Sequence, residues 1–308
     1  MTVVEAVYPT EVMSANTTLE TTDSQELIFQ VQGALFVALV VLSLPLNFRI
    51  LHIFLSKPSY RNEECYQIMI HIGIAQCLFA PGVLFQGIMK LLNHDVYHLA
   101  SLTVKAHPPV SRAEALMQLA LALNRLKLIC KLKYPSAIHT ILIIIAWLFG
   151  FSFLSFYFLF SEYVDLTATP DKILPYYDLS KPFSTAVRRA AAGIIVVTSS
   201  LTFIVYCIIF GYILYVKKTT GQTFKSYKEK SILIFASTRF LFDMMNAFSL
   251  LYRPFADDVV LEFFLSFGYP FNYLWLPPIL YLSMHREVRR QLLPWKKVSN
   301  AIAAIKMS

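Results

Sequence analysis

The composition of the chain differs from that of ordinary soluble proteins. Its 308 residues are 56% hydrophobic and only 15% charged, with a formal net charge of +8 at pH 7. Soluble domains carry about a quarter charged residues, and a soluble globule of this composition would expose too much apolar surface. The basic residues lie mostly in alternate loops and form no stripe interleaved with aromatic side chains, which argues against nucleic-acid binding.

Apolar blocks of membrane-spanning length follow one another along the chain. A bilayer core is crossed by a helix of about 20 apolar residues. The blocks that satisfy this length are 27–55, 66–92, 138–160, 186–216, 231–252 and 259–284, and a shorter apolar stretch lies within 112–130. We therefore predict an all-α, polytopic membrane protein in which one domain, 27–284, forms a bundle of seven transmembrane helices.

The basic residues of the loops decide whether the block at 112–130 spans the membrane. When it is counted as a span, most basic residues fall in the loops after the first, third and fifth spans and in the segment after the seventh. An excess of Lys and Arg on one side identifies the cytoplasmic side. The acidic segment 1–26, which has no Lys or Arg, is predicted to be extracellular, and the tail 285–308 is predicted to be cytoplasmic.

Two features of the terminal segments agree with this topology. Asn16 begins an Asn-Thr-Thr sequence that matches the N-glycosylation acceptor, so we predict a glycosylated tail, with an unmodified polar tail as the alternative. Residues 285–295 mix arginines with apolar side chains at a spacing that suits a short amphipathic helix on the inner leaflet. A solvated basic tail is the alternative there.

Polar residues inside the predicted spans are expected to face the interior of the bundle, because an ionisable group in contact with lipid is costly. Arg239 and Asp243 lie four residues apart on the sixth span and are predicted to pair, with a ligand or switch role as the alternative. Asn47 and His71, on the first and second spans, are expected to bridge helices rather than to bind a ligand.

Aromatic residues near the predicted outer ends of the helices are candidates for a ligand pocket. These candidates are Tyr163, Tyr176, Tyr177 and Tyr269. An aromatic belt at the membrane surface uses the same residue types and is the alternative interpretation.

The sequence has no motif of a known enzyme class. It lacks the HExxH, GxSxG, P-loop and dinucleotide-binding patterns, and its histidines and carboxylates do not cluster at the spacing of metal ligands. We predict no enzymatic activity, no catalytic residue, no metal and no cofactor.

Three segments carry a resemblance to a receptor family. Residues 60–77 (YRNEECYQIMIHIGIAQC) resemble the start of the second helix in nematode serpentine chemoreceptors, most closely class T (Srt). Asn124-Arg125, at the inner end of the third span, resembles the Asn-Arg that replaces the Asp-Arg-Tyr switch of common rhodopsin-like receptors. The sequence from Pro278 to Tyr281 is similar to the Pro-x-x-Tyr ending of the seventh helix.

The resemblance extends from the first span to Arg290 and implies a G-protein-coupled chemoreceptor of the plasma membrane, located in sensory-neuron cilia. Such a receptor would bind an environmental small molecule or peptide and signal to a heterotrimeric G protein. The resemblance assigns the coupling and switch roles to Asn124, Arg125, Pro278 and Tyr281. Arg125 would contact the G protein or hold the resting state, and Tyr281 would reposition on activation.

The basic residues of 217–230 are the predicted coupling surface. The alternative is that they only set the topology and contact anionic lipids.

One region departs from the family pattern. Residues 93–114 are charged, contain His107-Pro108-Pro109, and lack the cysteine that usually ties the third helix to the second outer loop, and 161–181 lacks the partner cysteine. Either the protein holds this loop without a disulfide, or the segment is incomplete.

Two other functions stay open. One is a transporter or channel that uses His71, Arg239 and Asp243, and the other is a receptor-like protein that does not signal.

Overall fold

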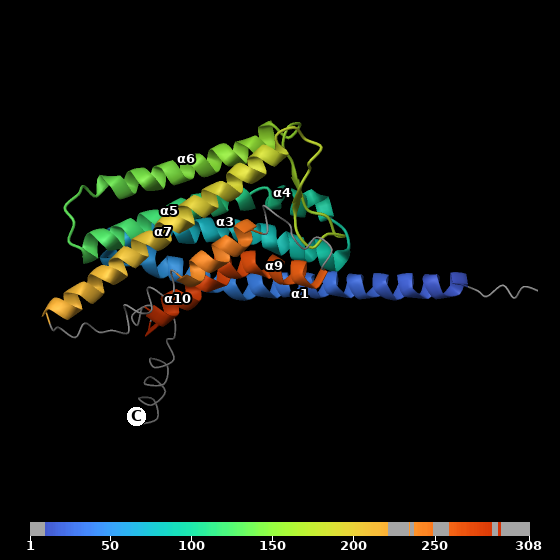
Figure 1. Ribbon diagram of the computed structural model, residues 1–308, viewed down its shortest axis with the longest axis horizontal. Helices are drawn as coiled ribbons and strands as arrows, with labels where there is room; N and C mark the ends of the chain where they lie inside the picture. The colour runs from blue at the N-terminus through green and yellow to red at the C-terminus, as the bar shows by residue number, and fades with distance from the viewer. Residues whose placement is uncertain (1–9, 221–233, 235–236, 249–258, 285–288, 291–308) are drawn as a thin grey trace, which may run out of the picture.

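The computed structural model describes residues 10–220, 234, 237–248, 259–284 and 289–290, without the side chains of 10–25, 220, 259–261 and 284. It is a bundle of long helices that run beside one another (Figure 1). The helices are α1 (Thr10–Ser56), α2 (Pro58–Arg61), α3 (Glu64–Leu92), η1 (Val96–His98), α4 (Leu99–Val104), α5 (His107–Ile129), α6 (Ala137–Leu159), α7 (Ser184–Thr220), α9 (Val259–Pro270), η2 (Phe271–Trp275) and α10 (Leu276–Met284). Residues 237–248 form a further helix.

Four of the described helices are long and apolar enough to cross a membrane. They are Glu26–Ser56 within α1, α3, α6 and Ser184–Thr219 within α7. α5 has 23 residues, so it is about 35 Å long and can also cross the hydrocarbon core. Its composition is less apolar because it lies at the centre of the bundle, where it packs against α3, α6 and α7 and buries polar residues.

The first two long helices cross at a pair of glycines. A β-carbon on Gly33 of α1 would lie 2.7 Å from the carbonyl oxygen of Gly87 in α3, and one on Gly87 would lie 2.9 Å from the carbonyl oxygen of Gly33. Small residues at such crossings let two helix backbones approach closely in a membrane. Larger side chains at either position would force α1 and α3 apart.

The segment between α3 and α5 is folded rather than an irregular charged loop. α3 ends at Leu92 and is capped by Asn93, which adopts a left-handed conformation with φ 49°, and η1 and α4 follow. The helix that was expected to start at residue 112 begins at His107, because Pro108 occupies its first turn, where a missing N–H is tolerated. The Asp95 carboxylate accepts hydrogen bonds from the backbone N–H of Ala100 at 2.9 Å and of Ser101 at 3.0 Å.

A short antiparallel hairpin, β1 (Leu166–Thr167) and β2 (Tyr176–Tyr177), lies across one end of the bundle (Figure 1). We call this end the hairpin end and the opposite one, which carries α2, the α2 end. Carbonyl oxygens of the segment accept hydrogen bonds from Gln32 Nε2 at 3.1 Å, Lys90 Nζ at 2.7 Å and Ser101 Oγ at 3.2 Å. Since all four cysteines are free, the hairpin is held without a disulfide.

The helix expected at 259–284 is divided by a π turn, a feature that the sequence did not predict. α9 ends at Pro270, one π turn follows as η2, and α10 contains Pro277 and Pro278. Proline has no N–H to donate to the carbonyl four residues earlier, so Pro278 leaves the carbonyl of Leu274 free. The N–H of Leu276 bonds to the carbonyl of Phe271, which releases the carbonyl of Asn272 in the same way.

Candidate functional site

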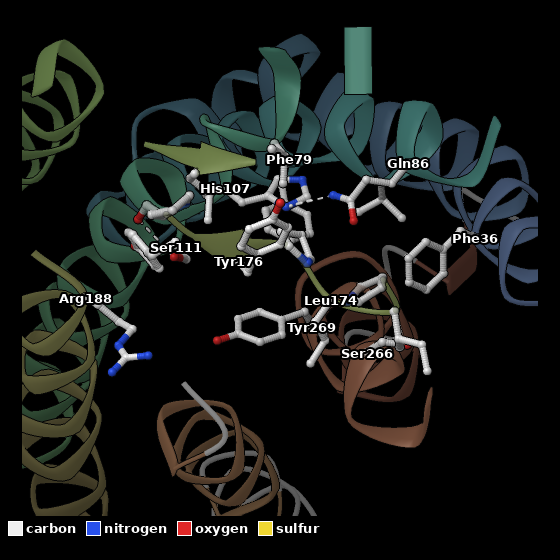
Figure 2. Close-up of a pocket in the computed structure, with 18 of the residues that line it drawn as sticks. Phe36, Phe79, Gln86, His107, Ser111, Leu174, Tyr176, Arg188, Ser266 and Tyr269 are labelled. Carbon is white, nitrogen blue, oxygen red and sulfur yellow. Dashed lines mark hydrogen bonds between the residues drawn. The ribbon is translucent and has the colours of Figure 1, made fainter. Parts of the chain in front are cut away.

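A cavity of about 170 Å³ lies beneath the hairpin (Figure 2). Helices α1, α3, α4, α5, α7 and α9 supply its walls, and residues of the hairpin segment, such as Leu174 and Tyr176, also line it. Most of the lining is apolar or aromatic, and the polar groups come chiefly from Gln86, Ser111 and Ser266 together with the basic residues described below. A concave, largely apolar space with a few polar groups is the usual form of a small-molecule site.

Three of the four tyrosines proposed from the sequence line this cavity. Tyr176 and Tyr177 reach it from β2, and Tyr269 reaches it from α9. The hydroxyl groups of Tyr177 and Tyr157 are 2.8 Å apart, which ties β2 to α6. The fourth, Tyr163, is 44% exposed and stacks on Phe183 with 5.7 Å between the ring centroids. It is not part of the cavity lining.

The cavity also contains basic residues that the sequence had not indicated as site residues. They are His107 and Arg112 of α5 and Arg188 of α7. His107 stacks on Phe79 with 4.1 Å between the ring centroids, and its Nδ1 lies 3.5 Å from Gln86 Nε2. In the sequence, Arg112 and Arg188 stand at the ends of predicted spans, where a basic residue ordinarily reads as part of a loop or membrane interface.

A buried ionic network lies below the cavity, in the middle of the bundle. The predicted pair is present but long, with 3.6 Å between Arg239 Nε and Asp243 Oδ1. The shorter contact of Arg239 is to Glu114 of α5, at 3.0 Å between Nη2 and Oε1. Glu114 is 0% exposed. Sequence reasoning missed it because helical spacing relates residues of one helix and not residues of two different helices.

Neutral side chains extend this network to other helices. Glu114 Oε1 accepts a hydrogen bond from Gln76 Nε2 of α3 at 2.9 Å. Asp243 accepts hydrogen bonds from Asn272 Nδ2 of η2 and from Ser199 Oγ of α7, both at 2.7 Å. The network therefore connects α3, α5, α7, the helix at 237–248 and the π turn.

The interrupted last helix contributes its backbone to the same region. Arg239 Nη1 donates to the free carbonyl of Asn272 at 2.8 Å, and the guanidinium carbon lies 4.8 Å from the ring centroid of Tyr273. Asn47 Nδ2 of α1 donates to the other free carbonyl, that of Leu274, at 3.0 Å. Side chains thus replace the N–H donors that the π turn and Pro278 remove.

His71 has a separate partner. Its Nδ1 accepts a hydrogen bond from Trp147 Nε1 at 3.2 Å, which connects α3 with α6. Arg239 and Asp243 border a second cavity of about 20 Å³, and His71 lines neither this cavity nor the larger one. The structure does not bring the three proposed transport residues together along one passage.

The residues assigned to coupling lie toward the α2 end. Asn124 is buried and its Nδ2 donates to Glu64 Oε2 at 2.8 Å. The guanidinium carbon of Arg125 lies 5.9 Å from the ring centroid of Tyr206 in α7. Arg125 Nη1 and the Tyr206 hydroxyl are both buried, and neither atom has a hydrogen-bond partner among the residues that the structure describes.

The seventh-helix ending lies in α10. Pro278 is buried, and the Tyr281 ring meets Phe54 of α1 edge to face with 5.9 Å between the centroids. Tyr281 also packs against the apolar cluster formed by α1, α3, α5 and α6 at this end. The structure therefore places Tyr281 and Arg125 in the same half of the bundle.

Some predicted features fall outside the described residues. These are 221–230 of the basic segment and most of 285–295, where only 289–290 are described. Lys217 and Lys218 form the last turn of α7. Asn16 lies within α1, but its side chain is not described. Across the described part of the chain, no group of three His, Cys, Asp or Glu side chains is placed to hold a metal ion.

The sequence matches no family model and no curated protein. Among solved structures, the chain is similar to squid rhodopsin, with a TM-score of 0.65 at 12% sequence identity. The match covers 88% of this chain and 86% of the rhodopsin chain. At this identity the likeness shows the fold alone. It confirms the predicted all-α, multi-pass membrane bundle of seven helices, of the type found in G-protein-coupled receptors.

Proposed function

We propose that this protein is a G-protein-coupled chemosensory receptor of the plasma membrane. The observation that carries the proposal is a ligand-sized cavity at the hairpin end of a rhodopsin-like bundle, above the buried ionic network around Arg239. The ligand is an environmental small molecule or peptide, and the partner at the α2 end is a heterotrimeric G protein. The resemblance to class T serpentine receptors supports a location in sensory-neuron cilia.

We place the hairpin end outside the cell and the α2 end in the cytoplasm. Lys57 precedes α2 and Arg61 is its last residue. Lys217 and Lys218 lie in the last turn of α7, on the same side of the bundle. Basic residues accumulate on the cytoplasmic side of membrane proteins. With this orientation the cavity opens toward the environment, and the tail that carries Asn16 is extracellular.

Aromatic contacts connect the cavity to the ionic network. Phe79 and Tyr269 line the cavity, and both stack on Tyr273, with centroid distances of 4.9 Å and 6.4 Å. Tyr273 in turn packs against the guanidinium group of Arg239. A ligand that displaces Phe79 or Tyr269 would therefore change the packing around Arg239. An agonist activates such a receptor when it binds the signalling conformation more tightly than the resting one.

The proposal is tested by expressing the full chain with a promiscuous G protein and a calcium reporter, and applying a chemically diverse panel of small molecules and peptides. We expect a calcium response to at least one compound, and Arg125→Ala should abolish it at equal surface expression. Arg189→Ala is the matched control, because Arg189 is exposed at the hairpin end.

Three results would contradict parts of this proposal. A response that persists in Arg125→Ala would remove the role assigned to Arg125. Compound-dependent current or uptake in vesicles without G protein, in place of a calcium response, would favour a transporter or channel. A panel that produces neither a calcium response nor a current or uptake would favour a receptor-like protein that does not signal.

A further inference from the structure

We infer that the cavity beneath the hairpin selects a small carboxylate, with Arg188 and Arg112 binding the negative charge. This inference rests on the proposed function, since it takes the cavity as the receptor's ligand site. It goes further by naming the chemical class of the ligand and the residues that recognise it.

The first observation is the unbalanced charge of the cavity. Arg112 and Arg188 both line it, and the lining includes no Asp or Glu. The ion pairs within the described part of the chain involve neither arginine. Buried or partly buried charges in proteins are normally paired. Two guanidinium groups on one cavity with no carboxylate partner among the described residues therefore suit an anion supplied from outside.

The second observation is that Arg112 is held in place by neutral acceptors. It is 2% exposed, and its Nη1 donates to the carbonyl of Pro108 at 2.7 Å and to Ser111 Oγ at 2.9 Å. Its Nε donates to the carbonyl of Ala191 in α7 at 3.3 Å. These bonds fix the guanidinium group but leave its charge uncompensated, and Nη2 takes part in none of them.

The third observation concerns Arg188, which lies one helical turn before Ala191 on α7. Because Arg112 bonds to Ala191, the two arginines belong to the same part of the cavity wall. Arg188 Nε is buried and has no hydrogen-bond partner among the described residues. Figure 2 shows Arg188 and Tyr269 on facing walls, with the Tyr269 hydroxyl turned toward the side from which Arg188 enters. Arg188 therefore has donors available for a ligand.

The volume of the cavity and the residues that line it restrict the class of ligand that it can hold. An apolar cavity of roughly 150 Å³ holds benzene, and this one measures about 170 Å³. Phe36, Phe79 and Val83 provide apolar surface for the body of the ligand. The planar guanidinium group matches a carboxylate with two parallel hydrogen bonds. The geometry points to a carboxylate on a short aromatic or branched aliphatic body.

The test measures binding to the purified full chain in lipid nanodiscs, without G protein, by ligand-observed NMR. The probes are benzoate, phenylacetate and 4-methylpentanoate, each compared with its primary amide, and benzamidinium serves as the cationic counterpart of benzoate. We expect at least one acid to bind about tenfold or more tightly than its amide, since hydrogen bonds to charged groups contribute most to such differences. Benzamidinium should not bind.

The matched variants are Arg188→Gln and Arg189→Gln. Arg188→Gln should weaken binding of the acid by about ten- to a hundredfold while changing amide binding little. Arg189→Gln, which changes an exposed neighbour outside the cavity lining, should leave acid binding unchanged. Arg188→Lys keeps the charge but loses the planar fork, so its affinity should fall between those of the wild type and Arg188→Gln.

The inference is overturned if no acid binds, if the amides bind as tightly as the acids, or if Arg188→Gln binds the acids like the wild type. Should Arg188→Gln fail to fold, the comparison of acid with amide on the wild-type protein still tests whether the cavity selects a carboxylate. Acid binding without any calcium response would leave the inference intact and contradict the proposed signalling. A calcium response to neutral or cationic compounds alone would support the proposed signalling and contradict the inference of a carboxylate ligand.

Discussion

Arg239 is a buried cation whose contacts come from three separate segments. Glu114 provides the shorter ion pair, Asp243 the longer one, and Asn272 a backbone carbonyl. Removing one member of a buried ionic cluster is costly because the remaining charge keeps its desolvation penalty. The residue that matters most to Arg239 is therefore Glu114 on α5, and not the residue one turn away on its own helix.

This difference in partners leads to a prediction. Glu114→Leu should destabilise the protein by about 3–5 kcal/mol, seen as a clear fall in unfolding temperature of the purified protein in detergent. Glu162→Gln changes an exposed carboxylate and should alter stability by no more than about 0.5 kcal/mol. Equal unfolding temperatures for the two variants would show that the contact between Glu114 and Arg239 contributes little.

Residue pairs that helical spacing determines could be predicted from the sequence, whereas pairs that depend on the rotation of one helix against another could not. Arg239 and Asp243 are four residues apart, so their shared face follows from the period of the helix. Glu114 lies 125 residues from Arg239, and only the packed bundle brings them together. The tyrosines show the same limit, because nothing in the sequence distinguishes Tyr163, which lies outside the cavity, from Tyr176, which lines it.

Among the helices, the interrupted last one shows how a local irregularity is compensated by a neighbour. The N–H missing at Pro278 leaves the Leu274 carbonyl free, and Asn47 of α1 supplies the donor. Apolar composition predicted a helical span at this place, but the π turn was not predicted. Whether a π turn forms depends on which backbone carbonyls receive hydrogen bonds from other helices. The apolar composition of the segment does not contain that information.

The compensation can be tested with a pair of variants. Asn47→Leu should destabilise the protein by about 1–3 kcal/mol, because a buried carbonyl loses its donor. Adding Pro278→Ala restores a backbone N–H within reach of that carbonyl. The double variant should therefore recover part of the lost unfolding temperature. Further destabilisation by Pro278→Ala in the Asn47→Leu background would contradict this account.

The short α4 helix carries a pH-dependent prediction. Partial burial acts to raise the pKa of Asp95, but hydrogen bonds from Ser101 and Ala100 outweigh it and hold that pKa below its ordinary value. A carboxyl group with a depressed pKa contributes stability above the pKa of its unfolded state, about 4, and loses that contribution as the pH falls through the folded pKa. Acidification below about pH 4 should therefore loosen α4.

Hydrogen exchange measured by mass spectrometry on peptides covering 95–104 tests this expectation. Protection in the wild type should fall as the solution is acidified, after correction for the intrinsic exchange rate. Asp95→Asn should show reduced protection already at neutral pH and a weaker dependence on acid. The same acid dependence in both proteins would assign the loosening to a different group.

For the whole molecule, the order and number of apolar blocks were enough to predict the bundle. Helix α5 was the uncertain span, and its polar residues are those that the bundle buries at its centre. The likeness to squid rhodopsin confirms this architecture. The cavity could not be predicted in the same way, because six helices and a hairpin segment contribute to it. No single segment of the sequence contains their relative positions.

The orientation in the membrane is a prediction for the molecule as a whole. In intact cells, an antibody should reach an epitope tag at the N-terminus and should reach one at the C-terminus only after permeabilisation. A glycosidase should increase the mobility of the protein on a gel, and Asn16→Gln should abolish that shift. Access to both tags from outside would contradict an odd number of spans and with it the seven-helix topology.

The way in which the hairpin is fastened has a practical consequence. Gln32, Lys90 and Ser101 hold it through hydrogen bonds and no disulfide closes it, so correct assembly does not depend on oxidative pairing of thiols. The protein is therefore suited to cell-free synthesis in the presence of reductant, where many secreted and cell-surface proteins fail. Dithiothreitol can be kept in every buffer to protect the four thiols without loosening the hairpin over the cavity.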